Sequence, residues 1–211
     1  MSQMRKVITV VLAVLTCSSL YADGIKIMGG LNLSKYAAST EDGSQGWNYK
    51  GGLCVGGGFE FDLSENRKIA VEIDALLIQK KGKREEDPAQ PKVERTYSLN
   101  TLCFPVLARI KFKENLPIYL LGGGTFSLIM SHNLQKRTGD QKRQTDFKES
   151  TKRTDLGLAL GMGFEIKIRE FQTVFLELRY HFGVVNLVQE IEDLESLKNH
   201  AFLIVFGIKS F

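Results

Sequence analysis

The sequence predicts an all-β fold, an eight-stranded antiparallel up-and-down transmembrane β-barrel. Three observations predict it: eight segments alternate apolar and polar residues, short and long connections alternate between them, and the polar face of the segments is built from small residues. The chain has 211 residues, 43% of them hydrophobic and 25% charged, which fits one folded domain and not a disordered chain. After residue 22 no apolar run approaches the roughly 18 residues of a membrane-spanning helix. A helical membrane protein is therefore excluded.

Residues 1–22 are predicted to be a secretory signal peptide. Arg5 and Lys6 precede an apolar stretch at residues 7–15, and small residues follow up to Ala22. This order of charged, apolar and small residues is typical of an export signal. We expect cleavage after Ala22, which leaves residues 23–211 as the barrel domain.

The first four predicted strands follow the signal peptide. Residues 24–34 read GIKIMGGLNLS and alternate apolar with polar or small residues, and residues 50–62 and 69–77 do the same. The fourth segment, residues 95–112, also alternates and contains Pro105. Because proline cannot donate to a ladder, we expect a bulge or a local break at Pro105.

Four more strands complete the set. Residues 117–132 and 174–184 alternate clearly, and residues 155–168 give the clearest pattern in the chain, with long apolar side chains at every second position. Residues 199–211 are apolar on both parities, so their register is open. Closing such a sheet into a barrel removes its exposed edges.

The connections between these segments are of two kinds. Short connections follow the second, fourth and sixth strands, and long ones follow the first, third, fifth and seventh. The short connections are residues 63–67, 113–116 and 169–172, and the long ones are 35–49, 82–94, 133–151 and 186–198. This alternation is the layout of an outer-membrane barrel.

Side-chain size indicates which face of the strands points inward. The polar face carries small residues such as Gly52, Gly56, Gly161 and Gly163, which suit a narrow eight-stranded lumen. Aromatic residues lie near both ends of the apolar face, as interfacial girdles do. They are Phe59, Phe61, Phe112, Phe164 and Phe171 near the short turns, and Tyr36, Trp47, Tyr49 and Tyr97 near the long loops. A soluble exported barrel that binds a hydrophobic ligand, as lipocalins do, would also alternate, and it is kept as the alternative.

Several stretches together resemble the PorT-like outer-membrane β-barrel proteins of Bacteroidetes-type bacteria, which are eight-stranded barrels similar to OmpX. The matching stretches are GIKIMGGLNLS, GGGFEFDLSENRKIAVEIDALLIQKKGK, YSLNTLCFPVLARIKF, IYLLGGGTFSL, DLGLALGMGFEI and VFLELRYHFGVVNL. The resemblance covers nearly the whole mature chain. It implies an outer-membrane location and, for the member that names the family, a role in exporting or maturing secreted proteins.

The inward-facing positions carry acids and bases in near balance. Unpaired buried charges are very unfavourable, so we expect these residues to form a structural charge network in the lumen and not a catalytic pair. The predicted network consists of Glu60, Glu72, Asp74, Arg109, Lys111, Glu165, Lys167, Glu177 and Arg179. A barrel plugged in this way is not expected to be a solute channel.

Little in the sequence points to catalysis, a metal or a cofactor. No Walker loop, HExxH, GxSxG or CxxC motif is present. Ser131 and His132 are adjacent on a strand, so they point to opposite faces and cannot form a nucleophile–base contact with each other. An outer-membrane lipid-modifying enzyme is the third alternative. We expect no cofactor and no metal site.

Two cysteines of the mature chain are predicted to remain free thiols. Cys54 and Cys103 both fall on the inner face, on the second and fourth strands. A third strand separates them, which places their Cα atoms near or beyond about 9 Å, past the roughly 7 Å limit for a disulfide.

The long connection at residues 133–151 is strongly basic. Four of its residues, Lys136, Arg137, Lys142 and Arg143, form the outer basic loop. This loop is either a solvated polar segment or a surface that meets lipopolysaccharide phosphates or an acidic partner. The formal net charge is only +4 beside 24 acids, so nucleic acid is not an expected partner. The sequence therefore predicts a non-enzymatic outer-membrane barrel with a surface binding or assembly role, whose partners are outer-membrane lipids and an envelope or secretion-machinery protein.

Overall fold

The computed structural model describes residues 22–40, 43–45, 48–86, 93–112, 116–138, 141–146, 153–185 and 196–211. Nearly all of the predicted signal peptide, residues 1–21, lies outside this set, and so does Trp47 of the predicted outer girdle. The side chains of Tyr36 and Tyr97 also lie outside the description. All strands of the barrel wall are described, from Gly24 to Ser210, and so are the connections at residues 63–68 and 170–171.

The described chain consists of strands. They are β1 (Gly24–Thr40), β2 (Gly43–Gln45), β3 (Asn48–Asp62), β4 (Ile69–Glu86), β5 (Val93–Lys111), β6 (Ile118–Thr138), β7 (Gln141–Asp146), β8 (Thr154–Arg169), β9 (Gln172–Gly183) and β10 (Ser196–Ser210). No helix in the described part of the chain is long and apolar enough to cross a membrane.

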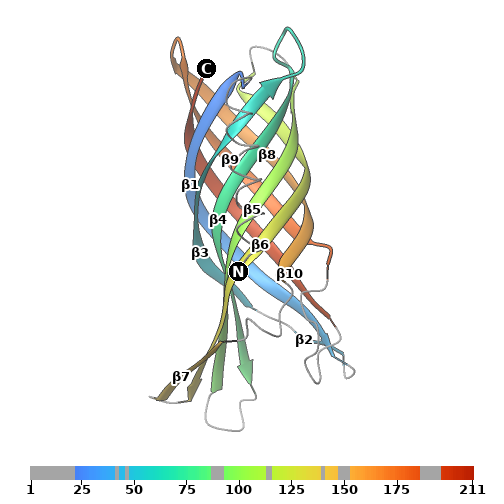
Figure 1. The fold of residues 1–211 in the computed structure, drawn as a ribbon, viewed down its shortest axis with the longest axis vertical. Coiled ribbons are helices and arrows are strands. Elements are labelled where there is room, and N and C mark those ends of the chain that lie inside the picture. The colour runs from blue at the N-terminus through green and yellow to red at the C-terminus, as the bar shows by residue number, and fades with distance from the viewer. Residues whose placement is uncertain are drawn as a thin grey trace, which may run out of the picture.

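Eight of these strands form a closed barrel (Figure 1). Neighbours along the chain pair in antiparallel order from β1 through β3, β4, β5, β6, β8 and β9 to β10, and the additional pairing of β10 with β1 closes the ring. β2 and β7 lie off the ring and pair with β1 and β6. The predicted fold class is confirmed, and closure leaves no free edge around the wall.

At the long-loop end, β4 extends nine residues beyond the predicted segment and β1 and β6 extend six residues each, whereas β5 begins only two residues earlier than predicted. β4, β5 and β6 have 18, 19 and 21 residues, whereas a tilted membrane-spanning strand needs about 9–11. Their ends pair with one another, and β7 adds a further strand to β6. Figure 1 shows these ends, together with β7, projecting past the barrel. The sequence of the extension is polar on both faces, so it has no alternating hydrophobic pattern from which pairing could be predicted.

The apolar face of the wall points outward. Ile27 of β1, Leu53 of β3 and Leu160 of β8 are 73%, 65% and 62% exposed. The residues directly before and after each of them in its strand face the interior. This confirms the predicted assignment of the faces and contradicts the soluble alternative, in which the apolar face would line the interior. The outward band is suited to contact with lipid hydrocarbon.

Small inner residues leave room for the large side chains that fill the lumen. A Cβ atom added at Gly163 would lie 2.2 Å from Cζ of Tyr119, and one added at Gly58 would lie 2.0 Å from Oδ1 of Asp74. Both positions therefore require glycine because a neighbouring strand projects a side chain across them. The glycine-rich polar face is thus a consequence of the narrow lumen.

Pro105 interrupts the ladder locally, as expected. The β4–β5 register pairs Ile73 with Val106 and Leu76 with Cys103, and it omits the two positions between them, where Phe104 and Pro105 lie. The register does not shift across this break. On the other side, Pro105 stays in register opposite Thr125 of β6.

The two described cysteines are free and buried. Cys54 lies opposite Ile78 and Cys103 lies opposite Leu76, so both flank β4 from its two sides. The predicted separation by one strand is confirmed.

We expect Leu160→Arg to lower the free energy of unfolding by about 2–4 kcal/mol, because an arginine near the midplane must lie in hydrocarbon. Ile168→Arg on the same strand is the matched control. Ile168 is 60% exposed but lies near the short-turn end of β8, so its substitution should cost only about 0–1 kcal/mol. Denaturant unfolding in lipid vesicles measures both values, and equal losses would contradict the assigned membrane position.

Candidate functional site

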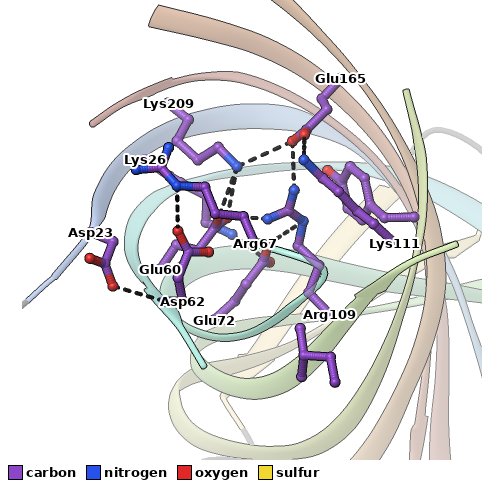
Figure 2. A network of polar contacts seen from close by, with 12 residues as sticks. Asp23, Lys26, Glu60, Asp62, Arg67, Glu72, Arg109, Lys111, Glu165 and Lys209 are labelled. Carbon is purple, nitrogen blue, oxygen red and sulfur yellow. Dashed lines mark hydrogen bonds and ion pairs between the residues drawn. The ribbon is translucent and has the colours of Figure 1, made fainter. Parts of the chain in front are cut away.

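The lumen near the short-turn end holds a cluster of five charged side chains, called here the rim cluster. Its members come from four strands and are Glu60, Arg109, Lys111, Glu165 and Lys209. Arg109 bridges two carboxylates, with Nη1 at 2.5 Å from Oε1 of Glu60 and Nη2 at 2.9 Å from Oε2 of Glu165. Lys209 Nζ lies 2.8 Å from Oε2 of Glu60 and 3.2 Å from Oε2 of Glu165, and Lys111 also pairs with Glu165. Figure 2 shows that these side chains converge from opposite walls.

A second cluster, the inner cluster, lies next to it and consists of Lys26, Glu72, Asp74, Glu177 and Arg179. Lys26 Nζ lies 2.5 Å from Oε2 of Glu72 and 3.1 Å from Oδ1 of Asp74. Arg179 donates from Nη1 to Asp74 at 2.7 Å and from Nε to Glu177 at 2.7 Å. All five side chains are at most 1% exposed.

The two clusters are continuous and neutral together. Arg109 Nε lies 3.8 Å from Oε1 of Glu72, which joins the rim cluster to the inner cluster. Tyr119 closes the other side, with its hydroxyl donating to Glu177 at 2.7 Å and its ring 4.6 Å from the Arg109 guanidinium carbon. Each cation faces carboxylates and each carboxylate faces a cation, which offsets the large desolvation penalty of burying them.

Most of the predicted network residues meet in these two clusters. Glu60, Glu72, Asp74, Arg109, Lys111, Glu165, Glu177 and Arg179 do so. Lys167 is a correction, because it is exposed and lines a pocket of about 350 Å³ at the short-turn end together with Glu170 and Phe211. The reason is its place at the end of β8, where the β8–β9 register shifts between Lys167 and Arg169 and the barrel no longer encloses the inner face.

The sequence-based prediction missed two cations and one hydroxyl. Lys26 and Lys209 are each 2% exposed, and Tyr119 is 1% exposed. The parity of Lys26, opposite to Ile25 and Ile27, is the signal that could have identified it. Lys209 was hidden because its strand is apolar on both parities.

Toward the long loops, the lumen holds buried apolar side chains together with buried polar ones such as Asn32, Thr101 and Asn199. One apolar cluster is formed by buried residues of six strands and extends in this direction from the level of Glu177. It consists of Met28, Cys54, Leu76, Ile78, Cys103, Phe175, Ala201, Leu203 and Val205. Among the described residues, one further ion pair lies in this half, between Lys80 Nζ and Oδ2 of Asp155 at 3.7 Å. His181 is 4% exposed, and no described group makes a hydrogen bond to either of its ring nitrogens.

The predicted outer basic loop forms a β-hairpin. Lys136 and Arg137 lie in β6, and Arg143 and Lys142 lie directly opposite them in β7. Two successive ladder pairs therefore each hold two basic residues. On its other side β6 pairs with β5, where Arg95 lies opposite Lys136 and Glu94 lies opposite Arg137.

The described residues bring together neither a nucleophile–base pair at Ser131 nor a metal site. Ser131 accepts a hydrogen bond from Asn100 at 2.9 Å, and the side chain of His132 lies outside the description. Within the described ranges, no three His, Cys, Asp or Glu side chains are placed to hold a metal ion.

The comparisons with known proteins give a family match and several structural similarities. The family described as outer membrane protein beta-barrel domain matches residues 24–189. Among solved structures, OprG of Pseudomonas aeruginosa is 14% identical over 90% of this chain and 96% of its own, with a TM-score of 0.47. Neisserial surface protein A is 12% identical over 88% of this chain and 96% of its own, with a TM-score of 0.45. No curated protein sequence is detectably similar to the chain.

The network predicts that replacing a buried arginine lowers the free energy of unfolding much more than replacing an exposed one. Arg179→Leu leaves the buried carboxylates of Asp74 and Glu177 without their main partner, so the free energy of unfolding should fall by about 3–5 kcal/mol. Arg67 also pairs with a carboxylate, Asp62 at 3.1 Å, but its side chain is 59% exposed. Arg67→Leu should therefore cost less than about 1 kcal/mol. Urea titrations of the folded barrel in micelles compare the two variants, and a small loss for Arg179→Leu would show that the inner cluster is not structural.

Proposed function

Because the chain belongs to the outer membrane protein beta-barrel domain family and lies in the outer membrane, we propose that it is a non-enzymatic barrel with a plugged lumen that binds acidic partners at the cell surface. The observation that carries the proposal is the sheet extension at the long-loop end. It is formed by the ends of β4, β5 and β6 with β7 added. Long connections of outer-membrane barrels are extracellular, so this extension is the part that a partner would meet.

The lumen supports a binding role over transport. The rim and inner clusters join different strands of the wall through buried ion pairs. Arg109 of β5, for example, pairs with carboxylates of both β3 and β8. An eight-stranded barrel has an interior only wide enough for side chains to fill. A solute would have to break several of these pairs at once, and each broken pair would leave an uncompensated buried charge.

The sign of the extension indicates the chemistry of the partner. The ladder pairs of Lys136 with Arg143 and of Arg137 with Lys142 bring four basic residues into one short hairpin. Basic residues gathered in this way attract phosphate, sulfate or carboxylate groups over a distance set by the ionic strength. The sequence motifs that resemble PorT-like barrels support an envelope or secretion-machinery protein as the physiological partner, and lipopolysaccharide is the second acidic candidate.

The test uses cells that carry the full-length protein in their outer membrane and fluorescent dextran sulfate as a polyanion probe. The double variant Lys136→Ser/Arg143→Ser should reduce cell-bound probe about tenfold, since two charge-assisted contacts are lost. High salt screens the charges and should weaken binding of the probe by wild type as well. The difference between the variant and wild type should therefore disappear at high salt.

The matched control removes the same number of charges from the opposite end of the barrel. Lys167 and Arg169 are exposed at the end of β8, and Lys167→Ser/Arg169→Ser should leave binding of the impermeant probe unchanged. Equal binding by the hairpin variant and wild type, at equal surface amounts of protein, would contradict the proposed binding surface.

A further inference from the structure

The outward surface of the seam that closes the barrel carries two basic side chains. Lys35 of β1 lies directly opposite His200 of β10 in the ladder. Apart from tyrosine hydroxyls, they are the only ionisable side chains at outward-facing positions of β1, β3, β9 and β10 among those the structure describes. Every other outward position of these strands holds an apolar residue, glycine, glutamine, serine or an aromatic ring. The pair is therefore a local feature of an otherwise uncharged surface.

The pair lies at the boundary between the membrane and water. Outward apolar positions of β1 run from Ile25 to Leu33, which are 50% and 44% exposed. This is the length of one tilted spanning strand, about 9–11 residues. Lys35 is the next outward position toward the long loops, so it lies at headgroup level on the outer side.

Aromatic rings hold both side chains in place. Lys35 Nζ lies 4.9 Å from the centroid of the Tyr49 ring. The Tyr180 hydroxyl lies 3.0 Å from Nδ1 of His200, and the two rings stack with centroids 6.2 Å apart. Phe182, opposite His200 in the β9–β10 ladder, stacks on Tyr180 in turn. Ordered side chains lose less conformational entropy when a ligand binds.

The chemistry of this surface fits an anionic amphiphile. A lysine ammonium donates charge-assisted hydrogen bonds to phosphate oxygens, and an imidazole N–H also donates to them. No described carboxylate pairs with Lys35, so nothing in the described part of the chain neutralises it. Two positions toward the membrane centre, Leu33 and Phe202 form the next outward-facing ladder pair and offer an apolar surface to acyl chains.

We propose that Lys35 and His200 form a binding site for the phosphate of an outer-leaflet lipid headgroup. Tyr49 and Tyr180 flank this phosphate at the interface. The apolar outward surface between this pair and the membrane centre contacts the acyl chains of the same lipid. The site differs from the basic hairpin of β6 and β7, because it lies on the lipid-facing wall and requires a ligand that is anchored in the membrane.

The test uses the full chain folded into phosphatidylcholine nanodiscs that contain lipid A, either with its phosphates or after enzymatic removal of them. Native mass spectrometry measures how much lipid A each protein retains. Wild type should retain the phosphorylated form about tenfold better than the dephosphorylated form, as expected for charge-assisted hydrogen bonds. Lys35→Gln should remove most of this preference, His200→Gln should weaken it, and Lys35→Arg should keep it.

Two controls separate this site from general effects. Lys167→Gln removes an exposed cation at the other end of the barrel and should leave the preference unchanged. The heat-dependent electrophoretic shift of folded barrels verifies that each variant is folded, and the retention of Lys35→Arg gives a second readout if the glutamine variant folds poorly.

The results that would overturn the proposal are specific. An undiminished preference in folded Lys35→Gln would show that the phosphate is not bound here, and so would an equal loss in Lys167→Gln. Displacement of lipid A by millimolar inorganic phosphate would show that the site takes free phosphate instead of a membrane lipid. Equal retention of the two forms of lipid A by wild type would show that only the apolar surface contributes.

Discussion

The architecture of this protein depends on the pairing of buried charges inside a narrow lumen. The wall encloses space for side chains alone, and the sequence fills the half near the short turns with carboxylates, lysines and arginines that are almost fully buried. Such charges are tolerated only when each one is paired and hydrogen-bonded. Arg109 and Arg179 meet this condition by bridging carboxylates from different strands. The same side chains require glycine at positions such as Gly58 and Gly163, which explains the composition of the inner face.

This internal plug allows the two ends of the barrel to differ. Near the short turns, contacts cross the lumen and join strands that are not neighbours in the sheet, such as the pair of Lys26 with Glu72. Near the long loops the lumen holds apolar and polar side chains, and β4, β5 and β6 continue past the wall as a sheet in which β5 pairs with both of its neighbours. A rigid support therefore carries an extension that can vary without disturbing the wall, as loops on stable scaffolds do.

The alternating pattern predicted the wall well because parity assigns each residue to lipid or lumen without any knowledge of its partners. It placed eight residues correctly in the charge clusters, and it identified the lipid-facing position of Leu160. The prediction fails at strand ends and in strands that are apolar at both odd and even positions, because alternation does not assign a face there. Lys167 lies at the end of a strand, beyond the enclosed lumen, and Lys209 lies in a strand that is apolar on both faces. The sequence predicts a long loop where β6 and β7 form a hairpin, since backbone pairing between polar segments leaves no hydrophobic pattern. The aromatic-flanked pair of Lys35 and His200 depends on the register of β1 with β10, which the sequence left open.

The most direct measurement of the plugged lumen is the ionic current through the full chain reconstituted in a planar lipid bilayer. If the rim and inner clusters close the interior, wild-type protein that is shown to be inserted should pass no stepwise current, while a large porin reconstituted in the same way does. Glu177→Gln, which changes a buried charge without changing the wall, should leave the bilayer equally silent or lower the stability of the barrel. Steady current steps in wild type that change in size with Glu177→Gln would show that ions pass along the charged lumen and would contradict the plug.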